Sequence, residues 1–208
     1  MQHPDSLQDN RSQMIGKILP IITEKGLKAT TMDLVAQRLG ISKRTLYEVF
    51  PSKSEMLKEA LQALGNQTQA YLTKAFAESD NVMEALITIF KHNRDLIGAV
   101  NINFYRDMDH LYKDKRQAYD HTRDVHHEKM MHLYRLGVEQ GMFRPDVDYE
   151  VQGRMIGLQM EALKRVEELF PAGITLQRVF DSIIVGFLRS IASDKGRKVL
   201  ENLTKDIT

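Results

Sequence analysis

The amino-acid sequence predicts an all-α protein of about nine helices, and three observations lead to this fold class. Apolar residues recur at three- and four-residue spacing through most of the 208 residues, which is the period of an amphipathic helix. We find no stretch of useful length that alternates as a β-strand does. The five prolines mostly fall where a helical pattern ends, as expected of a residue that lacks the N–H group needed inside a helix.

Composition excludes several classes of protein. Hydrophobic residues make up 42% of the chain and charged residues 27%, which is ordinary for a globular protein. The absence of cysteine excludes disulfides, thiolate metal sites and thiol chemistry. Residues 1–14 are polar and lack the apolar core of a signal peptide, and no apolar run reaches the length of a membrane span. We therefore expect a cytoplasmic protein with no membrane partner.

The first helix is expected over residues 7–25. Ser6 precedes it and can cap its N-terminus, and Gly26 follows its last apolar position as a helix stop. Pro20 lies inside the pattern, so a kink or a division into two shorter helices is predicted. The apolar stripe of this helix consists of Met14, Ile15, Ile18, Leu19 and Ile22.

Residues 30–53 predict two short helices joined by a tight turn. Thr31 can cap the first of them, and Gly40 supplies the left-handed residue that ends it. The second helix has cations and hydroxyls in its N-terminal turn, an arrangement that suits insertion into the DNA major groove. We therefore predict a helix-turn-helix that binds DNA. Ser42 can cap this second helix, whose buried side is expected to hold Leu46, Val49 and Phe50.

The charge of the chain supports this interpretation only through its local distribution. The net charge of +1 is too small to indicate a nucleic-acid binder. Residues 38–53, however, hold four basic residues against one acidic residue, Glu48. A short basic stretch is by itself typical of a solvated helix face, whereas inside a helix-turn-helix pattern it favours DNA.

The same segment resembles the helix-turn-helix signature of the tetracycline-repressor (TetR) family of regulators. The resemblance implies a helix-turn-helix DNA-binding domain at about 1–60 and a helical ligand-binding and dimerisation domain at about 61–208. It also implies a homodimer, most simply a repressor, that leaves a palindromic DNA operator when a small-molecule effector binds. The matching positions are Thr30, Thr31, Val35, Ala36, Gly40, Ile41, Ser42, Thr45, Leu46, Tyr47, Phe50, Ser52 and Lys53.

Nine residues are predicted to lie at the DNA. Lys43, Arg44 and Thr45 are expected to contact base edges and phosphates. Lys53 is expected to contact a phosphate at the start of the next helix, where the family's pattern has a lysine. The ring of Tyr47 is expected to pack in the small helical core with its hydroxyl toward a phosphate. The full set is Thr30, Thr31, Ser42, Lys43, Arg44, Thr45, Tyr47, Glu48 and Lys53.

Glu48 has two interpretations. Its carboxylate can accept a hydrogen bond from a cytosine amino group in the groove, although an acidic residue there also repels phosphate. Equally, it can pair with Arg44 one turn earlier, at the i,i+4 spacing.

The rest of the chain is expected to be helical between short loops. A capping box at residues 52–55 starts a fourth helix that extends through Leu64, and Asp148 and Thr175 can cap two later helices. The segment after residue 194 is expected either to form a short helix or to fray. The other expected helices are 81–98, 101–109, 113–140, 148–169 and 175–192.

A histidine-rich stretch suggests a rival interpretation, a helical metal-binding or enzymatic bundle built on residues 121–132. Glu128 and His132 share a helix face on which a divalent metal can be held. The stretch is heavily charged and lacks the HExxH order, however, and no nucleophile in a strained turn accompanies it. We therefore expect a solvated helix face, with no metal site, no cofactor and no catalytic residue. The histidines concerned are His121, His126, His127 and His132.

Methionines gather in the second part of the chain. Flexible thioethers with aromatic neighbours can line an adaptable apolar pocket for an effector, although ordinary core packing explains each residue singly. The resemblance to ligand-responsive regulators favours a cavity, and the sequence does not single out its lining residues. The residues concerned are Met83, Met108, Met130, Met131, Met155 and Met160, beside Phe90, Phe104, Tyr105, Tyr112 and Tyr134.

The last two long helices predict a subunit interface. Gly153 and Gly157 allow another helix to approach closely, and the helix at 175–192 is apolar around most of its circumference. Such a helix must be buried on more than one side, which a symmetric four-helix contact between two copies provides. The alternative is a central helix inside the monomer. The predicted interface residues are Gly153, Ile156, Met160, Val179, Phe180, Ile183, Ile184, Phe187 and Ile191.

Overall fold

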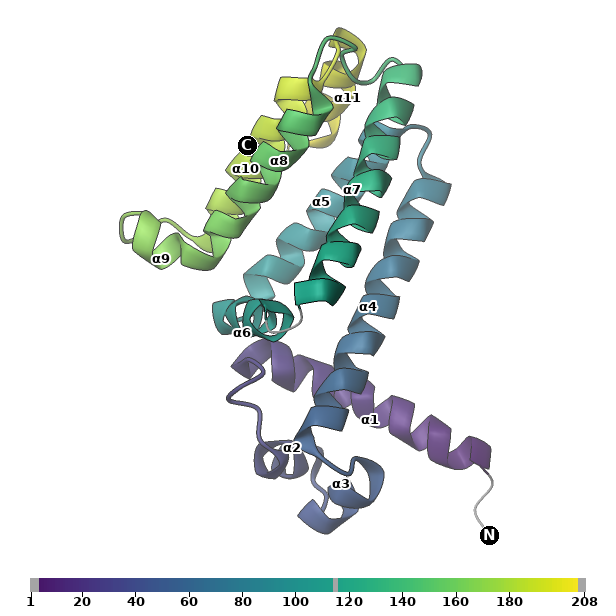
Figure 1. The fold of residues 1–208 in the computed structure, drawn as a ribbon, viewed down its shortest axis with the longest axis vertical. Helices are drawn as coiled ribbons and strands as arrows, with labels where there is room; N and C mark the ends of the chain where they lie inside the picture. The colour runs from purple at the N-terminus through teal and green to yellow at the C-terminus, as the bar shows by residue number, and fades with distance from the viewer. Residues whose placement is uncertain (1–3, 114–115, 206–208) are drawn as a thin grey trace. The chain divides into compact units, whose positions relative to one another are not determined.

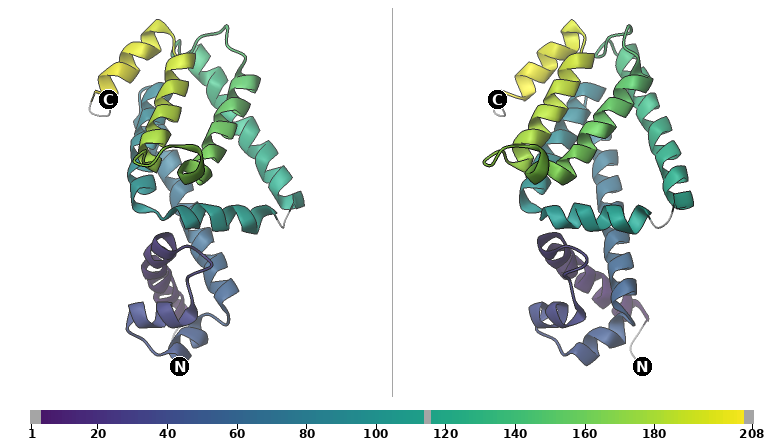
Figure 2. Two further views of the ribbon diagram at one scale, coloured as in Figure 1. Left: turned by 90° about the vertical axis from the view of Figure 1, so that its left-hand side faces the viewer. Right: turned by 60° about the vertical axis from the view of Figure 1, so that its left-hand side comes forward.

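The computed structural model describes residues 4–113 and 116–205, and within them the side chains of 10–108 and 127–205. Helices account for most of this part of the chain, as Figure 1 and Figure 2 show, and its only strand-like pairing is one bridge between Phe143 and Ala192. The all-α prediction is therefore confirmed. The elements are α1 (Pro4–Lys25), α2 (Met32–Leu39), α3 (Lys43–Val49), α4 (Lys53–Glu78), α5 (Val82–Ala99), α6 (Ile102–Lys113), α7 (Arg116–Glu139), α8 (Tyr149–Ala162), the 3-10 turn η1 (Leu163–Arg165), α9 (Val166–Leu169), α10 (Leu176–Ile191) and α11 (Asp194–Leu203).

The chain divides into two compact units, which we call the head and the body. The head comprises Met1–Tyr71 and Ala99–Leu111, and the body comprises Leu72–Gly98 and Tyr112–Thr208. Helix α4 runs without interruption through the position near residue 60 where the sequence suggested a boundary, and it ends in the body. Most of α6 belongs to the head, although many residues separate it from α1 to α3 along the chain.

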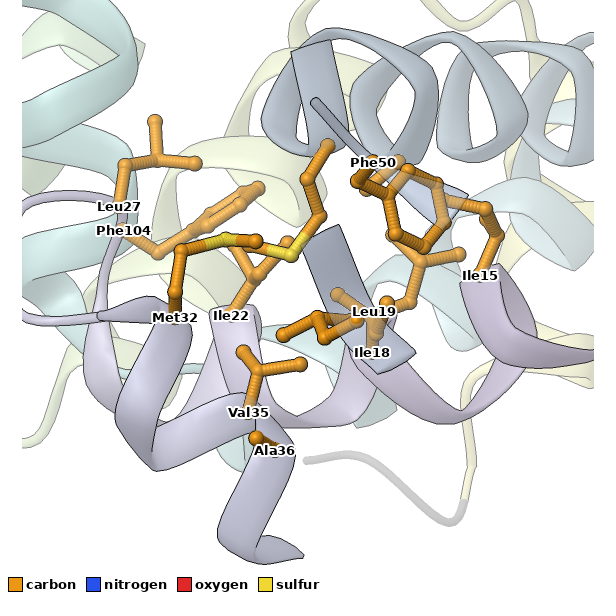
Figure 3. Close-up of a cluster of buried hydrophobic side chains, with 13 residues drawn as sticks. Ile15, Ile18, Leu19, Ile22, Leu27, Met32, Val35, Ala36, Phe50 and Phe104 are labelled. Carbon is orange, nitrogen blue, oxygen red and sulfur yellow. The ribbon is translucent and has the colours of Figure 1, made fainter. Parts of the chain in front are cut away.

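The core of the head forms where the apolar stripe of α1 meets the inner faces of α2, α3 and α4. Figure 3 shows side chains from α1 and α2 converging near Phe50, with Phe104 from α6 in the same cluster. A cluster of this kind fixes the short helices α2 and α3, which are too short to be stable alone. Its buried members include Ile15, Ile18, Leu19, Ile22, Met32, Val35, Leu46, Phe50 and Phe104.

Pro20 does not divide α1 into two helices, so that part of the prediction is wrong. The helix is continuous from Pro4 to Lys25 with Pro20 inside it. Both Pro20 and Gly16, whose carbonyl loses its usual partner to a proline four residues later, lie on the exposed side of the helix. Because Gly16 is exposed, water can replace the lost partner of its carbonyl, and the proline is tolerated at low cost.

The body packs α8 against α7 and α10, and α11 against α10. The caps expected at Asp148 and Thr175 are present at the starts of α8 and α10. The Asn81 side chain likewise accepts from the Glu84 N–H at 3.0 Å, at the start of α5. The C-terminal segment forms a helix, α11, which begins after a side-chain cap at Ser193. Among the described residues we find no helix with the length and apolar character to cross a membrane.

The expected helix at 148–169 is interrupted, which corrects the prediction of one continuous helix. α8 ends at Ala162, and the turn η1 leads into the single turn α9. Leu163 and Val166 are both buried in one cluster of the body. Residues three apart lie above one another in a 3-10 turn, so the tighter winding lets both side chains face the same core.

Candidate nucleic-acid interface

The turn between α2 and α3 is built as the sequence predicts. The Thr31 hydroxyl accepts the Leu34 N–H at 3.2 Å and caps α2. Gly40 takes the left-handed conformation with φ 67°, and its N–H donates to carbonyls in the last turn of α2. The Ser42 hydroxyl then accepts the Thr45 N–H at 3.0 Å and caps α3. These local bonds satisfy the free ends of two short helices and hold them at a fixed angle.

Helix α3 has one buried side and one exposed side. Leu46 and Phe50 are fully buried in the head core, and Val49 is half buried. Lys43 and Arg44, by contrast, are exposed in the N-terminal turn. The predicted burial on the inner side is therefore confirmed, and the outer side is free to enter a groove. The remaining exposed side chains of α3 and its cap are Ser42, Thr45, Tyr47 and Glu48.

Both cations at the start of α3 are paired with acids of the same chain. The Lys43 ammonium lies 2.8 Å from an Asp33 carboxylate oxygen, and this hydrogen bond raises the pKa of Lys43. Arg44 Nε donates to Glu48 at 3.1 Å, one turn later. The pairing of Glu48 with Arg44 is thus present. Exposed pairs of this kind contribute little to stability, so phosphates can replace the acids at small cost.

Lys53 is the first residue of α4, and the Ser52 hydroxyl accepts the Glu55 N–H at 3.1 Å there. The Lys53 ammonium donates to the Lys28 carbonyl at 2.9 Å. Because an ammonium has three N–H donors, this bond orients the lysine and leaves donors for a phosphate. The exposed α4 N-terminus adds a favourable field for an anion.

Tyr47 lies differently from the expectation. Its side chain is 43% exposed, so the predicted packing of its ring in the head core is wrong. Leu46 and Phe50, one helical turn apart, already fill that side of α3, and a residue next to Leu46 points about 100° away from it. The side chain is therefore partly open to solvent, and the phosphate contact of the hydroxyl stays a prediction.

Thr30 and Thr31 lie at the entrance to α2 but differ in exposure. Thr30 is fully buried, and its hydroxyl donates to the Gly26 carbonyl at 2.7 Å. In this conformation it holds the loop after α1 and offers no surface to DNA. Thr31 is exposed and is the one of the two that can reach a phosphate.

Two residues near the interface were not assigned to it from the sequence. Asp33 pairs with Lys43 across the turn, and Lys28 supplies the carbonyl that holds Lys53. Neither contact follows a helical spacing, since the partners are 10 and 25 residues apart. The one local feature is the acidic residue in the first turn of α2, which is typical of helix stabilisation rather than of a contact with α3.

The histidine-rich helix α7 makes a contact that needs no metal. His127 Nε2 lies 2.9 Å from a Glu150 carboxylate oxygen on α8. In the part of the chain whose side chains are described, no three His, Asp or Glu residues form a group able to hold a metal ion. The side chains of His121 and His126 lie outside the described residues. The expected absence of a metal stays a prediction.

The predicted interface residues in the body are all buried or half buried within their own chain. Val179 and Phe180 belong to one core cluster and Ile191 to another, so α10 finds its many apolar neighbours inside the monomer. A Cβ on Gly153 would lie 3.6 Å from the Tyr134 ring, whereas one on Gly157 would meet open space in the described structure. The exposed apolar surface lies instead on α8, at Val151, Met155 and Leu158.

The body also carries an open groove of about 470 Å³ between α8, the α9–α10 connection and α10. The methionines singled out from the sequence do not line it: Met83, for example, is fully buried in the core, where ordinary packing accounts for it. The groove is lined by Gln159, Ala162, Phe170, Ile174, Arg178, Val179, Ser182 and Ile183.

Comparisons with known proteins agree with this architecture. Residues 19–60 match the family model "Bacterial regulatory proteins, tetR family". Over 154 residues the chain is 28% identical to the HTH-type transcriptional repressor KstR2 of Mycobacterium tuberculosis, an alignment that covers 72% of this chain and 77% of KstR2. The solved TetR family transcriptional regulator PfmR from Thermus thermophilus is 30% identical with a TM-score of 0.55, covering 85% of this chain and 97% of PfmR. The solved KstR2 of Mycobacterium tuberculosis gives a TM-score of 0.61 at 24% identity, covering 89% and 96% of the two chains.

A helix-turn-helix whose second helix exposes a cationic N-terminal turn, joined to a helical body, defines the class of DNA-binding transcriptional regulators. Within that class, the chain belongs to the TetR family. It is a regulator and not an enzyme, and the rival interpretation of an enzymatic bundle is overturned.

Proposed function

We propose that this chain is a homodimeric, ligand-responsive regulator, most simply a repressor that leaves a palindromic operator when a small molecule binds the body. The observation that carries the proposal is the exposed N-terminal turn of α3, with Lys43, Arg44 and Thr45. The ammonium of Lys53, held by the Lys28 carbonyl, supports it. Its operator DNA would place the working protein in the cytoplasm.

DNA binding would replace ion pairs inside the protein with contacts to DNA. Phosphates and base edges compete with Asp33 for Lys43 and with Glu48 for Arg44, and both pairs are exposed enough to exchange. Direct base contacts from this turn would determine the sequence. Phosphate contacts from Thr31, Tyr47 and Lys53 would fix the position of α3 and make the affinity depend on salt.

Dimerisation would use the outer face of α8. Val151, Met155 and Leu158 lie at positions i, i+4 and i+7, so they share one side of the helix, and each is strongly exposed in the single chain. Gly157 beside them leaves room for close approach. A two-fold contact buries the same patch on both copies, and it can hold two heads at the roughly 34–36 Å spacing of operator half-sites.

The effector response would act through α4. This helix begins with Lys53 in the head and ends with Glu78 in the body, so a change of its tilt moves a residue expected at the DNA. A ligand that binds the body better at one tilt shifts the spacing of the heads. It releases DNA only to the extent that its affinity differs between the two states.

A gel-shift experiment with DNA from upstream of the protein's own gene tests the proposal. We expect a shifted band that survives excess unrelated DNA and whose binding curve is cooperative. A protein that is folded and dimeric but shows the same weak affinity for all DNA would contradict the operator-binding function.

A further inference from the structure

A buried carboxylate of the head has no role in the DNA contacts described above. Asp107 on α6 is only 8% exposed, and its Oδ2 accepts the Lys28 N–H at 2.8 Å. Its other oxygen, Oδ1, lies 3.7 Å from the Lys28 ammonium. A carboxylate is costly to bury unless its oxygens are satisfied, so the position of Lys28 and the burial of Asp107 depend on each other.

The loop that contains Lys28 is shaped to receive this carboxylate. Gly26 is left-handed with φ 88°, and a Cβ built on it would lie 3.0 Å from Asp107 Oδ2 and 3.3 Å from Asn103 Cβ. The absence of a side chain at this position therefore lets α6 come close. Thr30 closes the loop from its other end by donating to the Gly26 carbonyl at 2.7 Å.

Lys28 links this loop to the proposed DNA surface. Its N–H donates to Asp107, and its carbonyl, in the next peptide group, accepts the Lys53 ammonium at 2.9 Å. The two bonds lie on either side of one Cα atom, so together they fix both peptide planes around Lys28. Asp107 thus holds the Lys28 backbone on one side of this Cα atom, and the Lys28 carbonyl on the other side holds the Lys53 ammonium.

We propose that Asp107 is a positioning residue for DNA binding, which acts through the backbone of Lys28 to aim Lys53 at a phosphate. The proposal rests on the proposed function, because it gives Lys53 a phosphate to contact. An oriented ammonium loses less freedom on binding than a free lysine side chain does. Displacing the loop should therefore weaken DNA binding even though Asp107 itself stays away from the DNA.

Two conservative variants separate position from charge. Asp107→Asn keeps an oxygen of the same reach for the Lys28 N–H but removes the charge. Asp107→Glu keeps the charge, but its extra methylene group pushes the carboxylate into the space beside Gly26. If position matters, Asn retains operator affinity within about twofold, and Glu weakens it by about three- to tenfold. If only charge mattered, the Asp107→Asn variant would bind DNA more tightly and the Asp107→Glu variant would bind as the wild type does. That result would overturn the proposal.

A double-mutant cycle with Lys53→Ala tests the path of the effect. Operator dissociation constants are measured by fluorescence anisotropy for the wild type, Asp107→Glu, Lys53→Ala and the double variant. In the Lys53→Ala background we expect Asp107→Glu to change operator affinity by less than about twofold, because the phosphate contact that it displaces is already absent. Independent effects that multiply would overturn the proposal. Asp181→Asn, which removes a charge from the Arg94 pair of the body, should leave operator affinity unchanged.

Hydrogen exchange of the Lys28 amide gives a readout that needs no DNA. We expect faster exchange in Asp107→Glu and near wild-type exchange in Asp107→Asn and Lys53→Ala. If Asp107→Glu fails to fold, Asp107→Ala replaces it with the same expectations. A wild type that binds no operator would overturn the proposed function, and the inference with it. If the wild type binds its operator but the double-mutant cycle shows independent effects, the inference alone is overturned.

Discussion

Lys43 and Asp33 form an ion pair across the turn between α2 and α3, with 2.8 Å between the ammonium and a carboxylate oxygen. The cation expected at the DNA is thus partly neutralised within the free protein. The pair links the start of α3 to the first turn of α2. DNA must therefore exchange this acid for a phosphate or a base edge before Lys43 can contribute.

Removing that acid should strengthen DNA binding. Asp33→Asn frees Lys43 and takes a negative charge away from the phosphates, so we expect operator affinity to rise by about two- to fivefold at low salt. Because the effect is electrostatic, it should shrink as salt increases. Anisotropy titrations at several salt concentrations measure the operator affinity. The control is Glu78→Gln at the far end of α4, which also removes one acidic charge. Weaker binding by Asp33→Asn would show that the pair is needed to place α3.

The proposed dimer should depend on the outer face of α8. Leu158 is 71% exposed, so Leu158→Lys leaves the monomer core intact while placing a charge in the proposed interface. We expect monomers at micromolar concentration by sedimentation and loss of cooperative operator binding. Leu203→Lys on α11, also an exposed leucine, should stay dimeric. A wild type that is monomeric at micromolar concentration and still binds DNA normally would contradict the model.

The head should lose stability in acid through Glu59. Arg11 Nε donates to Glu59 Oε2 at 2.7 Å, and this hydrogen bond lowers the pKa of Glu59 below its ordinary value of 4.5. A lowered carboxylate pKa contributes stability that is present above pH 4.5 and is lost as the pH falls through the folded-state pKa. The unfolding free energy of the wild type should therefore drop between about pH 5 and 3 more steeply than that of Glu59→Gln. The unfolding free energies are measured by denaturant titrations at each pH. The same dependence on pH in both proteins would show that the pair adds no stability.

The local part of the head could be predicted from the sequence because its determinants are local. Thr31, Gly40 and Ser42 each act on a backbone group within five residues, and the buried side of α3 follows its helical period. The prediction for Tyr47 is wrong because successive residues of a helix face different sides. Leu46 faces the core, and Tyr47, the next residue, faces away from it. The pairing of Lys28 with Asp107 spans 79 residues, and no local spacing indicates it.

The body was harder to interpret because helical period alone does not say which partner covers an apolar face. The apolar residues of α10 suggest a second subunit, yet Val179 and Phe180 pack within their own chain. The opposite side of the helix is polar and exposed, with Arg178, Ser182 and Arg189 on it. The exposed stripe on α8 has the plain i, i+4, i+7 spacing in the sequence. The sequence-based interface includes Gly153, Ile156 and Met160 of this helix but not the exposed stripe, because hydrophobicity correlates with burial rather than with oligomer contacts.

Operator binding by a Lys43→Ala, Arg44→Ala variant tests whether α3 is the recognition helix, because both cations lie on the exposed turn of α3. We expect the folded, dimeric variant to lose specific affinity by about 1–3 kcal/mol for each base contact removed. Lys74→Ala, remote along α4, should bind as the wild type does. If the double variant bound its operator with wild-type affinity and specificity, α3 would not be the recognition helix.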